Sequence, residues 1–343
     1  MKHSIKIVMG SAFMLALPLL LTSCEDVLGH WEKPTPAPLG SIENPYSIST
    51  SADWDAFAAK VNGGETNIHA KQTGDISGVT TVIGTEDNPF KGTYDGQGYK
   101  ISDINITGDS HLGLFGYVSS PDAVIQNVVV ASGTVTGAGR SYGAIVGTLH
   151  EGKVDHCVNY ADISSSYSSA EAGARIGGIV GWSYGDNTAV NTITNCINFG
   201  NISATGAKGS YAGGIVGCFG IATHGLGDTV EHCQNYGTIS TTYGIGIGGI
   251  IGFFYVGSGD HYTVKNNHNG GNLTNTANAS NNIIWGGNFP GESAVDPSNT
   301  YWSSMTLTLS GALQTLSTYA HGAKAVDSNP EGITIGSKTY TKE

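Results

Sequence analysis

The sequence is short of charge, and the charge it carries is mostly acidic. Charged residues occupy 12% of the 343 positions, and 15 Lys and Arg are set against 27 Asp and Glu, which gives a net charge of −12. Arginine occurs only as Arg140 and Arg175. Soluble domains usually carry about 25% charged residues. An acidic chain with so little arginine lacks the basic surface that binds nucleic acid, so we expect no nucleic-acid partner.

Cysteine is also scarce, and no two cysteines are spaced as a CxxC pair. The five are Cys24, Cys157, Cys196, Cys218 and Cys233. So few in a chain of this length do not form a disulfide framework, and the missing CxxC argues against zinc. His150-Glu151 begins like a zinc-peptidase motif, but the next histidine is His156, too far along to share a helix face. We expect no metal, no cofactor and no catalytic residue.

The chain has one apolar run, at its start, and that run is too short and interrupted for a confident membrane span. Lys2 precedes this run and Lys6 lies at its start, and the run ends in Leu21-Thr22-Ser23-Cys24. Positive charge, apolar residues, small residues and cysteine in this order resemble a bacterial lipobox. The resemblance implies removal of residues 1–23 as a lipoprotein signal peptide and lipid on Cys24, the expected membrane contact.

Two features after Cys24 extend this interpretation. Glu25-Asp26 resembles the surface-export signal of Bacteroidetes lipoproteins, which implies an outer-membrane protein that faces the cell exterior. Prolines then alternate from Lys33 to Pro38, a pattern typical of a semi-rigid polyproline II spacer. We therefore predict that residues 24–41 form a lipidated tether.

Glycine, in contrast, is abundant, with 51 residues, and much of it is periodic. A five-residue motif such as Gly177-Gly-Ile-Val-Gly181 recurs, closing at Gly116, Gly147, Gly181, Gly217 and Gly252. A second motif follows the later ones, at Cys157–Ile163, Cys196–Ile202, Cys233–Ile239 and Asn267–Leu273. Repeats of 20–50 residues indicate a solenoid, propeller or array, and short β-branched runs without helical periodicity favour strands. A β-propeller is the alternative, but its blades need roughly 40–45 residues and hairpins.

If the units stack as coils, equivalent residues lie one strand spacing, roughly 4.8 Å, apart. Isoleucines then form inner ladders, at Ile179, Ile215 and Ile250 and at Ile163, Ile202, Ile239 and Leu273. Which of Ile179 and Val180 points inward stays open. Asn159, Asn198, Asn235 and Asn269 are expected at left-handed corners with stacked amides. Cys157, Cys196 and Cys233 are expected to be small buried hydrophobes.

The Gly-Gly-Ile-Val-Gly units resemble the GLUG repeat of bacterial surface proteins. Asn88–Ile101 also resembles the segment that commonly precedes such repeats. The resemblance covers Pro89 to Trp302 and implies an all-β, right-handed parallel β-helix, or β-solenoid, with repeats over residues 89–304. GLUG repeats occur in non-catalytic parts of IgA-cleaving metallopeptidases, so the resemblance implies no single activity.

A solenoid exposes its core at both ends and needs caps. We assign residues 42–88 to an N-terminal cap with a short helix over Ser51–Val61, in which Ser51 caps the first turn. Its apolar face is Trp54, Phe57, Ala58 and Val61. We assign residues 305–343 to a C-terminal cap with a weaker helix over Leu309–Tyr319, and expect Tyr301-Trp302 to close the last coil.

Three acids follow a glycine after successive Gly-Gly-Ile motifs: Asp186, Asp228 and Asp260. Converging, they would form a Ca²⁺ or catalytic site. Their distances from the closing glycines differ, however, so ordinary turn chemistry is the simpler interpretation.

Aromatic residues also recur at fixed positions, Tyr160, Phe199 and Tyr236 in one row and Tyr117, Trp182 and Phe253 in another. The second row is interrupted by Thr148 and Cys218. Rows that face inward belong to the core, which is the simpler interpretation. Rows that face outward would give a flat platform on which sugars or other partners stack.

Anchor, spacer and repeats without a catalytic cluster predict a cell-surface lipoprotein that acts as a non-catalytic adhesion or glycan-binding module. Its expected partners are the membrane, through Cys24, and host or bacterial glycans or surface proteins. Two alternatives stay open: a carbohydrate-active β-helix enzyme, either a polysaccharide lyase or a glycosidase, and a structural envelope component.

Overall fold

The computed structural model describes residues 35–167, 173–185, 189–206, 209–220, 226–255, 261–277, 280–287 and 296–342. The chain divides into two compact units, Met1–Pro38 and Leu39–Glu343. All described helices and strands lie in the second unit.

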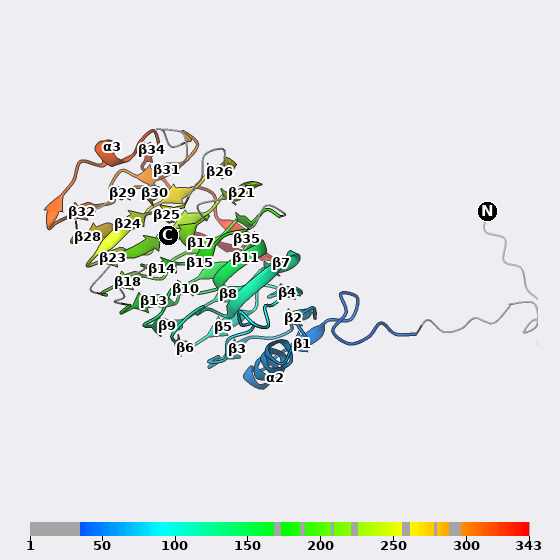
Figure 1. Cartoon of the computed structure of the whole chain (residues 1–343). Coiled ribbons are helices and arrows are strands. Elements are labelled where there is room, and N and C mark those ends of the chain that lie inside the picture. Colours follow the sequence, from blue (N-terminus) through cyan, green and yellow to red (C-terminus); the bar gives the residue numbers. More distant parts are fainter. Residues whose placement is uncertain are drawn as a thin grey trace, which may run out of the picture. The chain divides into compact units, whose positions relative to one another are not determined.

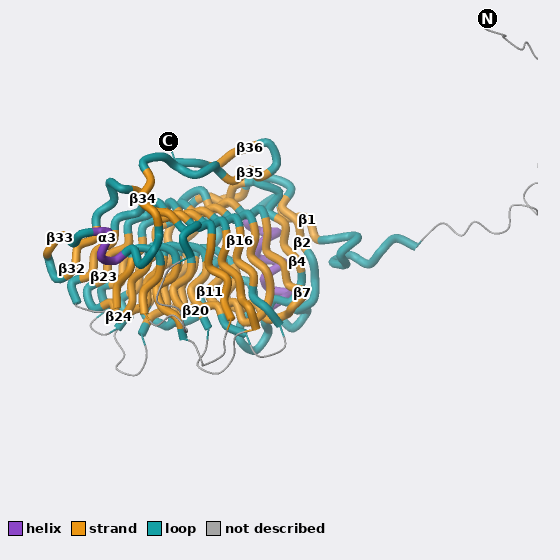
Figure 2. Tube along the Cα trace, turned by 90° about the horizontal axis from the view of Figure 1, so that it is seen from above, coloured by secondary structure: helices purple, strands orange, loops and turns teal. Residues whose placement is uncertain are grey.

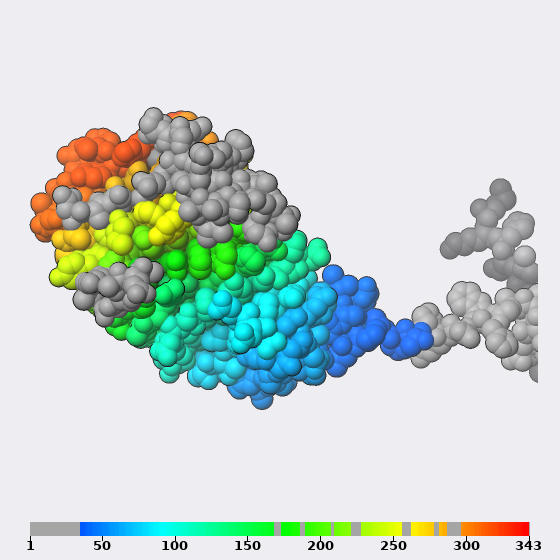
Figure 3. Space-filling model, viewed as in Figure 1, coloured from blue at the N-terminus to red at the C-terminus, as the bar shows by residue number. Residues whose placement is uncertain are grey.

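The second unit is a stack of coils built from four sheets, called A to D here, whose strands are parallel except for the last pair of sheet C. From β7 to β30 each coil passes through sheets A, B, C and D in turn and returns to sheet A; the earlier coils have no strand in sheet D. The strands run side by side in Figure 2, and in the space-filling view the sequence colours follow one another as successive bands (Figures 1, 2 and 3). The prediction of a β-rich chain with long parallel sheets, as in a β-solenoid, is therefore confirmed.

The bounds of the strands follow sheet by sheet. Sheet A holds β1 (Tyr46–Ile48), β2 (Ala70–Gln72), β4 (Thr93–Asp95), β7 (Phe115–Gln126), β11 (Val146–Asp155), β15 (Val180–Ser183), β16 (Thr192–Thr194), β20 (Val216–Phe219), β21 (Leu226–Glu231), β25 (Ile251–Phe254), β26 (His261–Lys265) and β30 (Trp285–Gly287). Sheet B holds β3 (Ile76–Ser77), β5 (Lys100–Ser102), β8 (Val129–Val130), β12 (Val158–Asn159), β17 (Ile197–Asn198), β22 (Gln234–Asn235), β27 (His268–Asn269), β31 (Thr300–Trp302) and β34 (Lys324–Val326). Sheet C holds β6 (Ile104–Gly108), β9 (Gly133–Gly137), β13 (Asp162–Ser165), β18 (Ile202–Ala204), β23 (Ile239–Thr241), β28 (Leu273–Asn275), β32 (Leu307–Leu309) and β33 (Ala312–Leu313). Sheet D holds β10 (Ser141–Gly143), β14 (Ala174–Gly177), β19 (Ser210–Gly213), β24 (Gly244–Gly248) and β29 (Ser280–Asn282).

The sequence repeats set the register of the coils. In sheet C, Ile163 pairs with Ile202, Ile202 with Ile239, and Ile239 with Leu273. All four side chains are buried. The second ladder also forms, because the backbone of Ile179 bonds to Ile215 and that of Ile215 to Ile250. The sequence left open which of Ile179 and Val180 enters the core. Both side chains are fully buried, so both do.

The asparagine ladder is confirmed, but its place in the coil differs from the prediction. Each amide donates a 2.9 Å hydrogen bond to the carbonyl oxygen of the next, from Asn159 to Asn198, then to Asn235 and to Asn269. These residues are buried and do not have a positive φ. The left-handed corner lies earlier in each coil, at His156, Asn195, His232 and Asn266, with φ between 51° and 57°.

The asparagine ladder explains why the second residue of the Gly-Gly-Ile motif is glycine. A Cβ on Gly178, Gly214 or Gly249 would lie within 2.2 to 2.3 Å of the amide carbon of Asn198, Asn235 or Asn269 respectively. No side chain fits at that distance. The second glycine of each Gly-Gly pair is therefore required where the backbone packs against an asparagine amide.

The cysteine prediction is confirmed. Cys157, Cys196 and Cys233 lie fully buried on successive coils and are not disulfide-bonded. Burial raises the pKa of the Cys157 and Cys196 thiols well above the usual value. Buried thiols held in the protonated form are poor nucleophiles, so these residues act in packing.

The N-terminal helix, α2 (Ser51–Asn62), is confirmed with one correction. Thr50, not Ser51, is the N-cap, and it forms a capping box with Asp53. Its apolar face, as predicted, is buried; Trp54 lies 5.6 Å from the ring of Tyr94 and 5.9 Å from that of Phe115. Parallel pairing already begins at Tyr46, so the first coils lie within residues 42–88 rather than after them.

The C-terminal prediction needs more correction. Leu309–Tyr319 is not one helix: it holds the end of β32, the strand β33 that turns back on it, and a four-residue helix, α3 (Leu316–Tyr319). Ser310 and Gly311, both with positive φ, make the hairpin turn that breaks the helix. Tyr301 and Trp302 do not close the stack, because β34 adds a further parallel rung beside β31.

The last residues lie along the side of the stack rather than over its end. We call residues 330–342 the C-terminal strap; it contains the antiparallel hairpin β35 (Ile333–Ile335) and β36 (Lys338–Tyr340). In Figure 2 this hairpin lies over the stacked strands. Its buried side chains, Ile333, Ile335 and Tyr340, pack in one apolar cluster with the outward residues Val129, Val158 and Ile197 of sheet B.

One buried histidine makes stability depend on pH. His268 is 1% exposed; its Nδ1 contacts the Thr300 hydroxyl at 2.9 Å, and its Nε2 has no partner among the described residues. Burial lowers the pKa of His268 from 6.5 to about 4. Above pH 6.5 the histidine is neutral in both states. As the pH falls towards 4, the histidine is protonated in the unfolded chain but stays mostly neutral in the folded chain, so the free energy of unfolding decreases.

We expect this histidine to contribute a loss of about 3 kcal/mol of unfolding free energy between pH 7 and pH 4. Chemical denaturation at several pH values, compared between wild type and His268→Gln, isolates its share, since Gln234 occupies the same position one coil earlier. The variant should lose less stability on acidification. Parallel pH curves for the two proteins would contradict the assignment.

Candidate functional site

The first aromatic row faces outward, but its rings do not form a platform. The predicted row is Tyr160, Phe199 and Tyr236. The structure adds Trp302, whose ring lies 5.5 Å from that of Tyr236, and we call the four residues the ring row. Tyr160 stacks on Phe199 at 4.6 Å and 12°, and Phe199 on Tyr236 at 5.4 Å and 15°. Rings stacked along the coil axis cover each other's faces and leave mainly their edges to solvent. The flat sugar-binding platform expected for an outward row is therefore wrong here.

The ring row is also partly covered. Tyr160 is 42% exposed, whereas Tyr236 is 7% exposed and donates its hydroxyl to Gln234. Tyr236 belongs to the apolar cluster that the C-terminal strap closes, and Phe199 and Trp302 pack against it. The ring row is thus chiefly a packing surface for the strap.

The second row lies on sheet A. The register places Tyr117, Thr148, Trp182, Cys218 and Phe253 on one line, as the repeat predicted. Trp182 and Phe253 are half-buried at the surface, and Thr148 and Cys218 are buried between the larger side chains. Further rings join this row from neighbouring positions. We call the whole group the aromatic band: Tyr117, His150, Trp182, Tyr184, Tyr211, Phe253 and Tyr255.

One half of the aromatic band centres on Trp182. Its ring stacks on Tyr184 at 3.9 Å, and Tyr184 lies 4.8 Å from His150. The hydroxyl of Tyr184 is 2.5 Å from that of Tyr117. The imidazole Nδ1 of His150 contacts the Ser119 hydroxyl at 2.9 Å. This half therefore combines aromatic edges with hydroxyl and imidazole groups.

The other half centres on Tyr211, whose ring lies 4.5 Å from Phe253 and whose hydroxyl is 3.0 Å from that of Tyr255. Arg175 joins the two halves. It pairs in register with Tyr211 on the next coil, and its guanidinium lies 3.9 Å from the centroid of the Trp182 ring.

Sequence analysis missed Tyr184, Tyr255, His150, Tyr211 and Arg175. The first three were within reach, because side chains alternate along a strand and each of them comes two residues after the predicted row. Tyr211 and Arg175 belong to sheet D, where no aromatic repeat points to them. Only the fold brings that sheet beside the predicted row.

Tyr117 and Tyr211 of the aromatic band stay protonated at any physiological pH. Burial, then the neighbouring hydroxyl, raises the pKa of both Tyr117 and Tyr211. A neutral phenol both donates and accepts a hydrogen bond. The band thus offers paired hydroxyls that suit a polar, hydroxyl-rich ligand.

Of the three acids predicted as a Ca²⁺ or catalytic site, Asp228 lies among the described residues. Asp228 is a strand residue, 3% exposed, and its Oδ1 accepts a 2.6 Å hydrogen bond from the backbone of Asn191. It is a strand residue and not a turn residue, so the turn interpretation is wrong for it. Asp186 and Asp260 lie outside the described residues. Across the described part of the chain, no group of three or more His, Cys, Asp or Glu could hold a metal.

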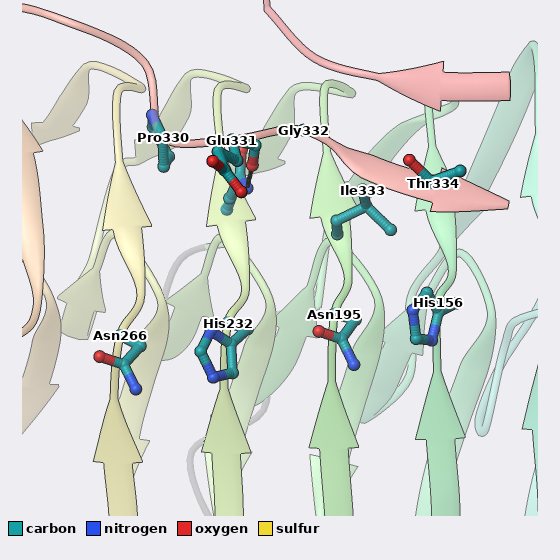
Figure 4. Close-up of a pocket in the computed structure, with 10 residues that line it drawn as sticks. His156, Asn195, His232, Asn266, Pro330, Glu331, Gly332, Ile333 and Thr334 are labelled. Atoms are coloured by element: carbon teal, nitrogen blue, oxygen red, sulfur yellow. Dashed lines mark hydrogen bonds between the residues drawn. The ribbon is translucent and has the colours of Figure 1, made fainter.

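A polar pocket lies where the C-terminal strap crosses the left-handed corners. Figure 4 shows His156, Asn195, His232 and Asn266 in a row on four neighbouring coils, with Pro330 to Thr334 passing across them. The cavity measures ≈ 300 Å³. His156 pairs with Asp155 at 3.0 Å. His156 and His232 are two coils apart, so they do not share a ligand atom.

Cys24, the predicted lipidation site, lies outside the described residues. In the ranges that are described, no helix is long and apolar enough to cross a membrane.

Fold and surface together define a β-solenoid-like protein with an aromatic band that spans two neighbouring sheets. No family model matches the chain. A crystal structure from Bacteroides ovatus, described as a candidate immunoglobulin A1 protease, superposes with a TM-score of 0.65 over 83% of this chain and 84% of that one, at 22% identity. At that identity the likeness supports the fold alone. Halomucin from Haloquadratum walsbyi is 26% identical over 216 residues, which are 52% of this chain but only 2% of that protein.

Proposed function

We propose that this chain is a cell-surface lipoprotein, held in the outer membrane by lipid on Cys24, whose solenoid binds glycans or surface proteins without catalysis. The right-handed sense of the coil and membership of the GLUG family belong to the same proposal. The lipobox-like segment and the proline-rich spacer support the anchoring. The aromatic band supports the binding.

The observation that carries the binding proposal is the composition of the aromatic band. Aromatic rings combined with paired hydroxyls are typical of recognition surfaces, where amphipathic aromatics give contact area at little cost in conformational entropy. The ring row has no pair of tyrosine hydroxyls among its described contacts, and the C-terminal strap covers part of it. The two surfaces therefore predict opposite outcomes when their rings are removed.

On a glycan array, we expect the full chain with Cys24→Ala to bind a restricted set of sugars. Trp182→Ala should weaken that binding at least about tenfold, the loss of one buried aromatic contact. The matched control is Tyr160→Ala, also an outward ring on the stack, which should bind like the parent. Equal loss in both variants would show that the effect is general instability.

The alternative of a carbohydrate-active enzyme is tested on the same protein by incubation with the polysaccharides that bind. The name of the Bacteroides ovatus protein also suggests peptide-bond cleavage, so immunoglobulin A1 belongs among the substrates tested. Release of sugar or peptide products would overturn the non-catalytic proposal. A protein that binds neither glycans nor surface proteins would favour the structural envelope role.

A further inference from the structure

Arg175 differs from the lysines that form ion pairs in the described chain, because its guanidinium is partly buried against an aromatic ring. Lys60, Lys153 and Lys265 each have a carboxylate partner 3.0 to 3.1 Å away. Arg175 has no carboxylate partner among the described residues, and its Nε atom is buried without a hydrogen-bond acceptor. Partial burial of an unpaired guanidinium is costly, because water no longer solvates the charge fully.

The surroundings of Arg175 are neutral rather than acidic. One face of the guanidinium lies over Trp182, and its register partner is Tyr211. Cys218 is also close: burial raises the pKa of its thiol to about 12, and the Arg175 charge acts in the opposite direction. A cation–π contact contributes only about 0.5–2 kcal/mol and leaves the N–H donors unsatisfied. The stack on Trp182 therefore orients the guanidinium without neutralising it.

A second unsatisfied group lies beside the guanidinium. Ser141 is the register partner of Arg175 on the preceding coil, so both side chains occupy the same position of sheet D. Ser141 is fully buried, and its hydroxyl has no partner in the described structure. The fully buried Ser141 hydroxyl cannot reach a surface ligand, whereas the guanidinium and the paired tyrosine hydroxyls form a set of donors that lacks an anionic acceptor.

We propose that the aromatic band binds an acidic glycan, with the sugar carboxylate on Arg175 and the sugar hydroxyls on the tyrosines. The inference rests on the proposed glycan-binding function and names its ligand class. Carboxylates suit the planar guanidinium because they accept two parallel hydrogen bonds from it. The protein carries a net charge of −12, so the partly buried guanidinium of Arg175 gives the aromatic band a local positive charge that an acidic glycan can meet.

Titration calorimetry on the full chain with Cys24→Ala tests the proposal with four probes. These are a galacturonic acid trisaccharide, 3′-sialyllactose, a sulfated disaccharide and lactose as the neutral sugar. We expect a carboxylated probe to bind at least about tenfold more tightly than lactose, and to weaken as salt rises. Tighter binding of the sulfated probe than of both carboxylated probes would overturn the carboxylate assignment.

Arg175→Gln should remove the preference for the carboxylated probe, and Arg175→Lys should keep part of it, since a point charge replaces the planar fork. The matched control is Arg140→Gln, an exposed arginine one coil earlier, which should bind like the parent. If Arg175→Gln does not fold, the preference of the parent protein among the four probes and its salt dependence still test the proposal. Equal binding of lactose and the acidic sugars would refute this inference but keep the proposed function. Binding to none of the four probes would refute this inference, and the glycan array would then decide the proposed function.

Discussion

Replacing Asn198 by alanine should destabilise the protein by about 3 kcal/mol, the cost of leaving buried polar groups unpaired. Asn198 is fully buried; it accepts from Asn159 and donates to Asn235 and to the Gly200 carbonyl, at 2.8 to 2.9 Å. Alanine removes all three bonds and leaves a carboxamide oxygen of Asn235 without its donor. The measurement is the free energy of unfolding in urea, followed by circular dichroism.

Asn105→Ala is the matched control for this experiment. Asn105 lies on β6 with an exposed side chain, so its loss should change stability by less than about 0.5 kcal/mol. Similar changes for the two variants would mean that the amide ladder does not stabilise the stack. Solenoids often unfold in segments, so the midpoint and the slope are both compared.

The second large effect is expected from loosening the C-terminal strap. Ile333→Asp combined with Ile335→Asp places two charges in the apolar cluster, and the hairpin should leave sheet B. Val129, Val158 and Ile197 then form an exposed apolar surface. Burying each of these side chains again, in contact with a second molecule, is favourable by roughly 1.5–3 kcal/mol. We expect the variant to self-associate and its strap to be cut rapidly by protease, while the coils stay folded.

The control for the strap is Thr334→Asp, which adds the same charge on the exposed side of the same strand. It should stay monomeric and resist protease as the parent does. Size-exclusion chromatography with light scattering reads the association directly. A monomeric, protease-resistant double variant would contradict the role of the strap.

The sequence predicts the repeating part of this fold well, because each coil repeats the same physical requirement. Ile163, Ile202 and Ile239 must fill one core, and Gly178, Gly214 and Gly249 must leave room for the asparagine amides. A repeat unit is not recognised in the sequence where its residues depart from this pattern. Asn282-Ile283-Ile284-Trp285-Gly286 adds a further rung, with Asn282 beside Gly248, although it lacks the paired glycines.

The ends and the surface were less predictable. Nothing periodic marks residues 330–342, whose contacts with sheet B join positions far apart in the sequence. The left-handed corners were misassigned because asparagine occurs both there, at Asn195, and on the ladder, at Asn198. For the aromatic band, the repeat gave Trp182 and Phe253, but Arg175 and Tyr211 come from another sheet, and only the closed coil brings them alongside.

Cross-linking of designed cysteines tests the stacking of the coils most directly. Ser203 and Ser240 are register partners on neighbouring rungs of sheet C, and Ser164 lies one rung before Ser203. Neighbouring rungs are roughly 4.8 Å apart, within disulfide reach, and two rungs are not. Stacked coils predict that Ser203→Cys with Ser240→Cys forms a disulfide on mild oxidation, while Ser164→Cys with Ser240→Cys stays reduced. A first pair that fails to oxidise in the folded protein, or a second pair that oxidises as readily, would contradict the account.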